Sequence, residues 1–451
     1  MSASKPAMPA VPLRTGWRGR VVTLRYESAR SSRLVSGSLI MLLGSSVVSA
    51  VNFGYNVAIA RLLGPAGFGH ISAIVTLLML ASAITLSFQL VCAKFVARSD
   101  SLAGKAEVYR NLRRRAWLVG VTLGTALVLF SGPMSGYLRL PSSGLVVLLA
   151  TGIAFYVPLG VKRGGLQGTC NFAQLSANFI LEVVVKFLGA LLLVETGFGA
   201  TGAVAAIAAS VVIAYFVPLR DELLAPKSAG RVPAAPDLGA LGWMGAIPTS
   251  FREGLQAIVF FTGQVLINNV DILLVKHFFQ PEQAGLYAAV ALVGRVVYFA
   301  SWSVVSAMFP ISAGQKPTER NVSVLVVPLL FVLVIAVTFT LVLQLVPGTV
   351  MRMVFGSGFT QVAPLLSLYA TATGAYALSV VLIAFEMSRK LANTGWLQLL
   401  FSGLVVAGIA LFHSTLRQVI VVQLVLMVLL LIAVSPPFFR EQTLARPQEA
   451  A

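Results

Sequence analysis

Two stretches of the sequence, ARLLGPAGFGHISA (60–73) and KHFFQPEQAGLYAA (276–289), repeat one pattern of turn residues. In each, a long apolar run ends, and a proline is followed four residues later by a glycine. This arrangement predicts a tight turn whose glycine lets the next helix begin close to its partner. Two similar hairpins could give the same pattern, but a duplicated fold is favoured. One offset aligns Pro65 with Pro281, Gly69 with Gly285 and Asn52 with Asn268.

Apolar runs extend outward from both stretches. The chain has 451 residues, 57% hydrophobic and only 11% charged, whereas a soluble domain has roughly 25% charged residues. The runs match the about 20 residues of a spanning helix, and lipid offers no partner to backbone groups outside helices. We therefore predict an all-α integral membrane protein of about twelve transmembrane helices. The predicted spans are 36–59, 71–95, 116–137, 144–161, 175–194, 199–219, 255–278, 284–310, 322–346, 363–385, 395–412 and 419–436.

The basic residues are distributed unequally between the two sides of the predicted membrane. Of the 33 lysines and arginines, 25 fall on the side of the N-terminus, Lys162 and Arg163 among them, and five on the other side. The positive-inside rule then predicts an even number of helices and both termini in the cytoplasm. The net charge of +18 is thus a topology signal, and no nucleic-acid partner is expected. The five outer residues are Arg61, Arg139, Lys276, Arg352 and Arg417.

A polar interruption rich in Ala, Pro and Gly separates the sixth predicted span from the seventh. It has no apolar periodicity, so we interpret it as a cytoplasmic linker. The predicted organisation is a basic cytoplasmic tail at 1–33, a six-helix bundle at 34–219, the linker at 220–249, a second six-helix bundle at 250–436 and a cytoplasmic tail at 437–451.

Ionisable residues inside the predicted spans are candidate functional residues, because each costs about 2.5–3.5 kcal/mol at a helix centre. Arg295 lies well inside the eighth span, and Arg252 lies at the cytoplasmic mouth of the seventh. A guanidinium suits phosphate because it offers paired donors. A structural ion pair or a contact with backbone is the alternative for Arg295.

Amide and carboxyl side chains line one face of the seventh span, which predicts either a cavity wall or hydrogen bonds between helices. Glu182 and Lys186 lie four residues apart in the fifth span, which favours a mutually neutralising pair. A proton or ion relay through Glu182, Lys186 and Asp271 is the alternative. The candidate substrate-binding residues beside the two arginines are Gln256, Gln264, Asn268, Asp271, Asn52, Asn56 and Gln89.

Motifs for catalysis and metal binding are missing from the sequence. No phosphate loop of the ATPase type occurs, and the three histidines and two cysteines have no ligand spacing. The predicted outer loops are short, whereas an enzyme that polymerises or ligates saccharides would carry a large outer loop. We therefore expect neither an enzyme nor a resident cofactor, only possible proton or sodium coupling.

The segment 60–73, with RLLGPAGFG at its core, resembles the signature after the first helix of polysaccharide-biosynthesis flippases. These are the Wzx-like members of the multidrug/oligosaccharidyl-lipid/polysaccharide exporter superfamily. Residues 268–287 look like the second-half counterpart, except that Gln280 stands where a glycine is more usual. The resemblance implies two six-helix bundles around a central cavity lined by the first, second, seventh and eighth helices, and alternating access driven by an ion gradient or membrane potential.

The expected function is to flip or export a polyprenyl-pyrophosphate-linked repeat unit for cell-surface polysaccharide synthesis. The expected location is the bacterial inner membrane, where membrane lipids and other polysaccharide-assembly proteins would be its partners. A cation-coupled multidrug exporter of the same superfamily is the alternative function. Such exporters present acidic residues to cationic drugs, and this chain offers mainly Asp271 and Glu182.

Overall fold

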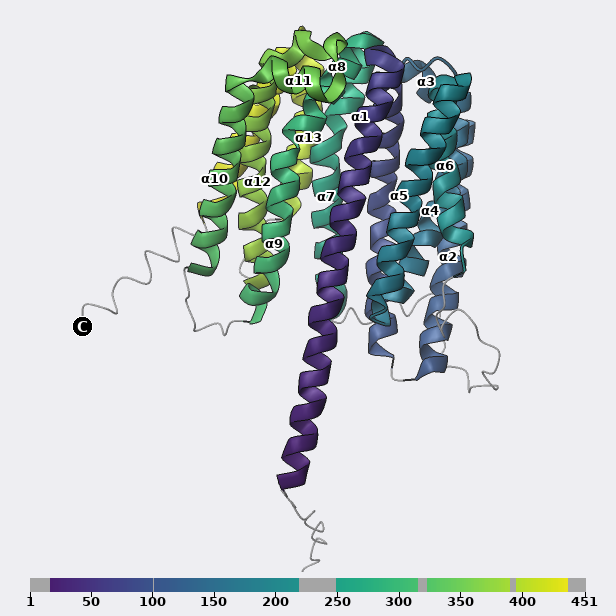
Figure 1. Ribbon diagram of the computed structural model, residues 1–451, viewed down its shortest axis with the longest axis vertical. Helices are drawn as coiled ribbons and strands as arrows, with labels where there is room; N and C mark the ends of the chain where they lie inside the picture. Colours follow the sequence, from purple (N-terminus) through teal and green to yellow (C-terminus); the bar gives the residue numbers. More distant parts are fainter. Residues whose placement is uncertain (1–16, 100, 219–248, 315–322, 390–394, 437–451) are drawn as a thin grey trace, which may run out of the picture.

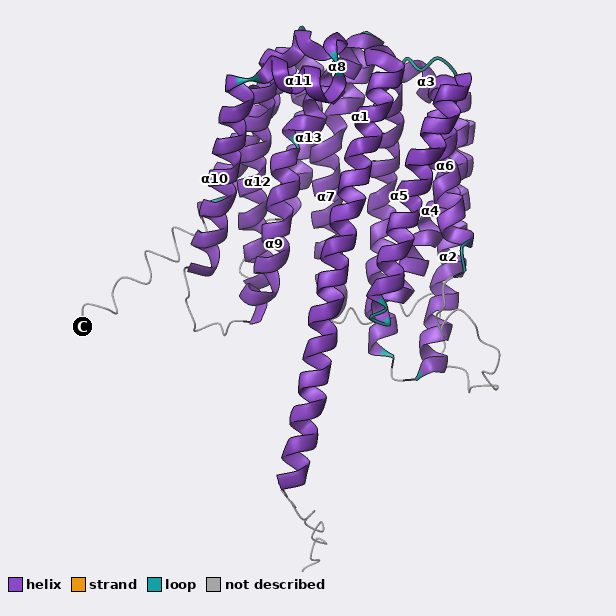
Figure 2. Ribbon diagram, viewed as in Figure 1, coloured by secondary structure: helices purple, strands orange, loops and turns teal. Residues whose placement is uncertain are grey.

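The computed structural model of the chain describes residues 17–99, 101–218, 249–314, 323–389 and 395–436. These residues form helices joined by short loops, and no strand occurs among them (Figure 2). The predicted tail 437–451, the linker apart from Thr249, and the first 16 residues lie outside the described part. Residues 17–33, expected in the N-terminal tail, belong to the first helix, which extends well past the other helices (Figure 1).

Glycine breaks divide the first half of the chain into its helices. The 82-residue helix α1 (Trp17–Arg98) is kinked at Gly64, whose φ of 67° a side chain would strain. Gly197 and Gly199 have similarly positive φ and separate α5 from α6. The other helices of this half are α2 (Leu102–Leu129), α3 (Ser131–Tyr137), α4 (Gly144–Gly168), α5 (Phe172–Leu193), the π-helical turn η1 (Val194–Phe198) and α6 (Gly199–Phe216).

The second half repeats this order, with one break that the hydropathy of the sequence does not show. The predicted span 284–310 is two helices in the structure, because α8 ends at Gly294 and α9 begins at Val296, with Arg295 between them. The helices of this half are α7 (Thr249–Phe278), α8 (Pro281–Gly294), α9 (Val296–Gly314), α10 (Ser323–Leu345), α11 (Pro347–Phe355), the 3₁₀ segment η2 (Ser357–Leu365), α12 (Leu366–Arg389), α13 (Gly395–Leu411) and α14 (Leu416–Val434).

The exterior of the helix bundle suits a membrane. Within the described residues, seven helical segments are long and apolar enough to cross a bilayer, or eight if the bent pair α2–α3 is one span. Two of the seven, Leu39–Arg98 and Phe172–Phe216, contain the glycine breaks and so hold two helices each. Large apolar side chains such as Leu345 and Leu129 point outward. The chain is a multi-pass membrane protein, and each predicted span falls on a helix or a bent helix pair.

The two halves of the chain lie side by side, with α1 and α7 between them (Figure 1). Helix α1 packs against α4 and α5 of its own half and against α7 and α8 of the other. Helix α7 packs against α13, and α12 contacts α9, α10 and α14. The helices that the resemblance implies as cavity walls, which correspond to α1, α7 and α8, therefore lie at the boundary between the halves.

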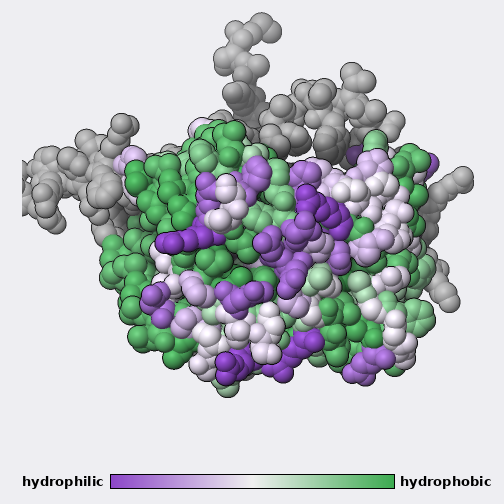
Figure 3. Space-filling view, turned by 90° about the horizontal axis from the view of Figure 1, so that it is seen from above, coloured by the Kyte–Doolittle hydropathy of each residue, from purple (hydrophilic) through white to green (hydrophobic). Residues whose placement is uncertain are grey.

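At one end of the bundle the halves are tightly joined, and we call this end, which carries α3, α8 and α11, the closed end. A Cβ atom on Gly69 would lie 2.5 Å from the Pro281 carbonyl oxygen, and one on Gly285 would overlap the Pro65 carbonyl. The two repeated turns therefore pack against each other across the halves, a contact that goes beyond the tight turn predicted within each half. Seen from this end, hydrophilic residues run across the face between hydrophobic left and right edges (Figure 3).

Polar contacts reinforce the closed end. The Arg61 side chain donates from Nε to the Val354 carbonyl at 2.8 Å and also bonds the Met353 carbonyl. On the other side of the junction, the His277 ring stacks on Tyr137 with 3.8 Å between centroids, and its Nδ1 lies 2.8 Å from the Tyr137 carbonyl. These contacts join the α1 and α3 turns of the first half to the α7 and α11 ends of the second.

Candidate functional site

A buried ion pair lies in the second half, at the break between α8 and α9. The Arg295 Nη2 atom is 2.8 Å from Asp271 Oδ1, and the Asp271 side chain is 0% exposed. The hydroxyls of Tyr287 and Tyr369 each donate to Asp271 Oδ2 at 2.9 Å. Arg295 Nε also donates to the Tyr369 hydroxyl at 3.1 Å. Both oxygens of the carboxylate are thus bonded.

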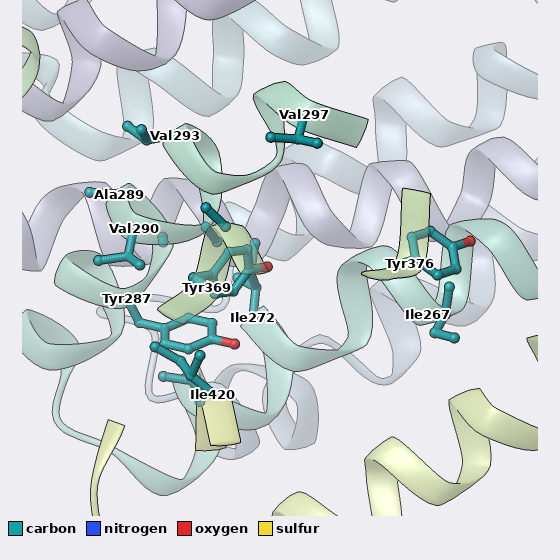
Figure 4. Packing of buried hydrophobic residues seen from close by; sticks show 14 of the residues in the cluster. Ile267, Ile272, Tyr287, Ala289, Val290, Val293, Val297, Tyr369, Tyr376 and Ile420 are labelled. Carbon is teal, nitrogen blue, oxygen red and sulfur yellow. The ribbon is translucent and has the colours of Figure 1, made fainter. Parts of the chain in front are cut away.

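Aliphatic side chains surround this network. Tyr287 and Tyr369 lie next to each other, close to Ile272 and Ile420 (Figure 4), and their ring centroids are 5.9 Å apart. Such an apolar setting strengthens the attraction within the pair, and it makes either charge costly without its partner. The break after Gly294 leaves Arg295 at the junction of two helices, from which its guanidinium reaches Asp271 on α7.

The structure thus brings together two residues that the sequence nominated separately. In this conformation the charge of Arg295 is neutralised by Asp271, as the ion-pair alternative anticipates. A role of Arg295 or Asp271 in substrate binding or ion coupling stays a prediction. Arg252 and Gln256 lie in α7, but their side chains fall outside the described residues.

A second ionic cluster lies in the first half, on α4 and α5. The Arg163 side chain pairs with Glu182, donates from Nε to Asn178 Oδ1 at 2.8 Å and lies 3.9 Å from the centre of the Phe179 ring. The direct partner of Glu182 is therefore Arg163 and not the expected Lys186, although the charges of Glu182 and Lys186 still interact. The guanidinium of Arg163 offers the carboxylate a planar set of donors from the neighbouring helix, which the single ammonium of Lys186 cannot match.

Lys186 makes a different set of contacts. Its Nζ bonds the Asn52 side-chain oxygen on α1 and lies 4.7 Å from the centre of the Tyr55 ring. Both are neutral groups, and neither salt bridge within the described residues includes Lys186. With Glu182 paired to Arg163, the cluster carries two cations and one anion. The cluster therefore has one positive charge in excess, and Lys186 places its ammonium next to a predicted site residue, Asn52.

Lys162 and Arg163 were expected in a cytoplasmic loop, and the structure corrects this. Helix α4 continues to Gly168, seven residues beyond the predicted end of the span, and both side chains are buried. Lys162 Nζ donates to the carbonyls of Tyr215 and Val217 at the end of α6, at 2.6 and 2.7 Å. A lysine at this position satisfies carbonyl groups that a helix end leaves unpaired.

The predicted amide residues divide into those that bond backbone and those that bond other side chains. Asn56 and Asn268 each donate to the carbonyl four residues earlier in their own helix, at 2.8 and 2.9 Å. Gln264 donates to the Tyr298 hydroxyl, and Gln89 Nε2 donates to Gln167 Oε1 at 3.1 Å. Gln264 and Gln89 thus link helices, as the alternative to a cavity wall predicts.

Asn52 and Asn268, the aligned asparagines of the repeat, remain partly exposed on α1 and α7, which pack against each other. The Asn52 amide with Lys186 bonded to it can bind hydroxyl groups and an anion. No group of three histidine, cysteine or acidic side chains that could hold a metal ion occurs among the described residues.

Known structures share this arrangement of helices, although no protein-family model and no curated protein sequence matches the chain. An inward-facing multidrug resistance MATE family transporter of the MOP superfamily superposes with a TM-score of 0.68 at 14% identity, over 90% of this chain and 99% of that one. The lipid II flippase MurJ, in an inward closed conformation, superposes with a TM-score of 0.67 at 12% identity, over 88% of this chain and 87% of that one.

The fold is that of these transporters. An outward-facing MATE transporter superposes with a lower TM-score of 0.55, at 16% identity over 92% of this chain and 96% of that one. The present structure thus has a higher score with the inward-facing and inward closed conformations than with this outward-facing one. The predicted all-helical transporter fold is confirmed, while the likeness does not distinguish between multidrug transporters and lipid flippases.

Several residues of the two clusters were missed in the sequence. Arg163 was counted as a loop residue because it lies two residues beyond the predicted end of the span at Val161 and directly before Gly164–Gly165, a pair that disfavours helix, although α4 continues through it. Tyr287 and Tyr369 carry no local signal, since tyrosine is common in membrane helices. Their hydroxyls are identified as partners of Asp271 only by the hydrogen bonds in the folded structure.

Proposed function

We propose that this chain flips or exports a lipid-linked oligosaccharide, carried on a polyprenyl pyrophosphate, across the bacterial inner membrane. The observation that carries the proposal is the charge balance at the boundary between the halves. Both carboxylates of the predicted site are already paired with arginines, whereas Lys186 adds a cation in excess and bonds Asn52. A site with a spare cation and exposed amides suits an anionic headgroup that bears many hydroxyls.

The proposed transport cycle is alternating access, in which the two halves rock about α1, α7 and α8. In the proposed orientation the closed end faces outward, because Arg61, Arg139 and Lys276 belong to the sparsely basic side. The described conformation then opens toward the cytoplasm, where a lipid-linked precursor is made. The higher superposition scores with inward-facing and inward closed structures support this orientation. Proton or sodium coupling through Glu182, Lys186 or Asp271 is part of the proposal.

Export of cationic drugs is the second candidate, since the MATE transporters superpose as well as MurJ does. A cationic drug requires an unpaired acid, and here Asp271 and Glu182 both face arginines. The two candidates differ in the phenotype of a gene deletion. Loss of surface polysaccharide, with lipid-linked oligosaccharide accumulating in the membrane, supports the flippase. Drug hypersensitivity with normal surface polysaccharide contradicts it and supports the exporter.

Lys186→Met tests the role of the excess positive charge. A hydrogen bond to a charged group contributes about 1.5–3 kcal/mol, which corresponds to roughly a 10- to 150-fold change in affinity. We expect surface polysaccharide to fall at least about tenfold when the variant replaces the parent protein at equal abundance. Lys105→Met, near the start of α2 and far from both clusters in the chain, is the matched control and should keep parental levels. Equal output from the two variants would remove Lys186 from the site.

A further inference from the structure

A lysine lies buried at the closed end without a partner. Lys276 is 0% exposed, and its Nζ has no hydrogen-bond acceptor among the described residues. Lys276 lies in the last turn of α7, which ends two residues later at Phe278 and leads into the α7–α8 turn. A buried amine without an acceptor is costly, so it normally has a partner or a function. Neither ionic cluster of the candidate site includes it.

A second unpartnered nitrogen lies opposite Lys276, on α1. The Nδ1 atom of His70 is also buried without a partner among the described residues. His70 follows Gly69, which approaches the Pro281 carbonyl and the Gly285 backbone, so the first turn after the α1 kink lies against the turn that bears Lys276. His70 and Lys276 are close enough for their charges to interact.

Arg139 completes the group from the first half. It is an exposed residue that follows α3, and its Nη1 donates to the Phe279 carbonyl at 3.4 Å. Its charge also acts on Lys276. The acidic residue of the same turn, Glu282, is exposed to solvent, whereas Lys276 is buried. Three nitrogen-bearing side chains from α1, the α3 turn and α7 thus lie at the junction.

We propose that Lys276, His70 and Arg139 form an anion site at the closed end, and that its ligand is a phosphoryl group. Ammonium and guanidinium groups with an imidazole N–H are the donors that phosphate oxygens accept, and a phosphoryl anion would satisfy the buried Lys276 amine. The ligand could be the pyrophosphate of a lipid-linked substrate or free phosphate. Binding of the lipid-linked pyrophosphate rests on the proposed function, in which this would be the last site before the substrate is released. Binding of free phosphate does not rest on it.

The test measures anion binding by the purified full-length protein in detergent, with inorganic pyrophosphate as the probe. We expect a saturable increase in the melting temperature of the parent protein, because a ligand that binds only the folded state stabilises it. Lys276→Met should weaken pyrophosphate binding at least tenfold, and His70→Gln should weaken it by a smaller factor. Arg417→Gln removes one exposed charge at the same end and should bind like the parent.

Stability of the variants does not obscure the result. Lys276→Met removes an unsatisfied buried amine, so its melting temperature without anion should equal or exceed that of the parent. Arg139→Gln, at an exposed position, provides a second variant that should also weaken binding. No pyrophosphate-dependent shift in the parent, or equal affinities in Lys276→Met, Arg139→Gln and Arg417→Gln, would overturn the site.

A second probe distinguishes the two sources of the ligand. If the parent binds a detergent-dispersed polyprenyl pyrophosphate more tightly than inorganic pyrophosphate, and Lys276→Met loses both, the site accepts the lipid headgroup. If only the inorganic anions bind, the site stands as one for free phosphate, and the exit role is overturned. Because these assays contain no transport step, a chain that binds pyrophosphate but moves no lipid would contradict the proposed function alone.

Discussion

Asp271→Asn is expected to lower the free energy of unfolding by about 3–5 kcal/mol, the cost of leaving one partner of a buried ion pair without the other. The substitution removes the negative charge that neutralises Arg295 and replaces one of the two acceptor oxygens by an amide donor, so either Arg295 or the hydroxyls of Tyr287 and Tyr369 lose their acceptor. Thermal or denaturant unfolding of the purified protein measures the effect. Glu195→Gln, at an exposed position in η1, should change stability by no more than about 0.5 kcal/mol.

A double substitution separates the charge from the packing. Asp271→Asn combined with Arg295→Met removes both charges, so it should recover part of the stability that Asp271→Asn alone loses. The coupling energy between the two positions should then be clearly different from zero. Additive losses in the double variant would mean that the pair contributes nothing as a pair, and would leave Arg295 available for a headgroup.

Gly285→Ala is expected to shift the protein away from the conformation in which the closed end is sealed. The new Cβ would overlap the Pro65 carbonyl, and the equivalent contact at Gly69, 2.5 Å from an oxygen, is already about 1 Å shorter than an ordinary carbon–oxygen contact. Overpacking of this kind costs roughly 1–3 kcal/mol, which would lower the ratio of sealed to open molecules about 5- to 150-fold.

Spin labels at Pro133 on α3 and Met353 on α11 report the separation of the halves at this end. Both positions are exposed, and Cys92 and Cys170 must first be replaced. Pulsed dipolar measurements should give one short distance in the parent and a longer, broader distribution in Gly285→Ala. Gly348→Ala in α11, where a Cβ would meet nothing within 4 Å, should resemble the parent. Unchanged distances in Gly285→Ala would mean that the junction does not govern opening.

Much of the fold could be predicted because a membrane imposes a single requirement on the backbone. Apolar runs of spanning length must be helical, and the repeated Pro-Gly turns then favour a duplicated fold. The approach of Gly69 to Gly285 across the halves could not be predicted, because a repeat does not indicate how its two copies pack. The break at Arg295 could not be predicted, since apolar residues continue on both sides of it and hydropathy does not detect a bend. The extension of α4 was missed because Lys162 and Arg163 resemble loop residues.

The candidate site was less predictable because its partners come from distant parts of the chain. Spacing within one helix favoured Glu182 with Lys186, but packing places Arg163 of α4 against Glu182 instead. Burial cost correctly marked Arg295 and Asp271 as residues that need partners, yet nothing in their spacing relates them. Tertiary contacts decide such pairs, and a single sequence does not contain them.

Reconstitution tests the central proposal most directly. The purified protein would be placed in vesicles that carry a polyprenyl-pyrophosphate-linked oligosaccharide, and a membrane-impermeant lectin or glycosidase would report how much glycan crosses to the opposite leaflet. We predict protein-dependent transfer that Lys186→Met reduces at least about tenfold and that Lys105→Met leaves unchanged. Transfer no faster than in protein-free vesicles, from a preparation that does accumulate a cationic drug, would contradict the account.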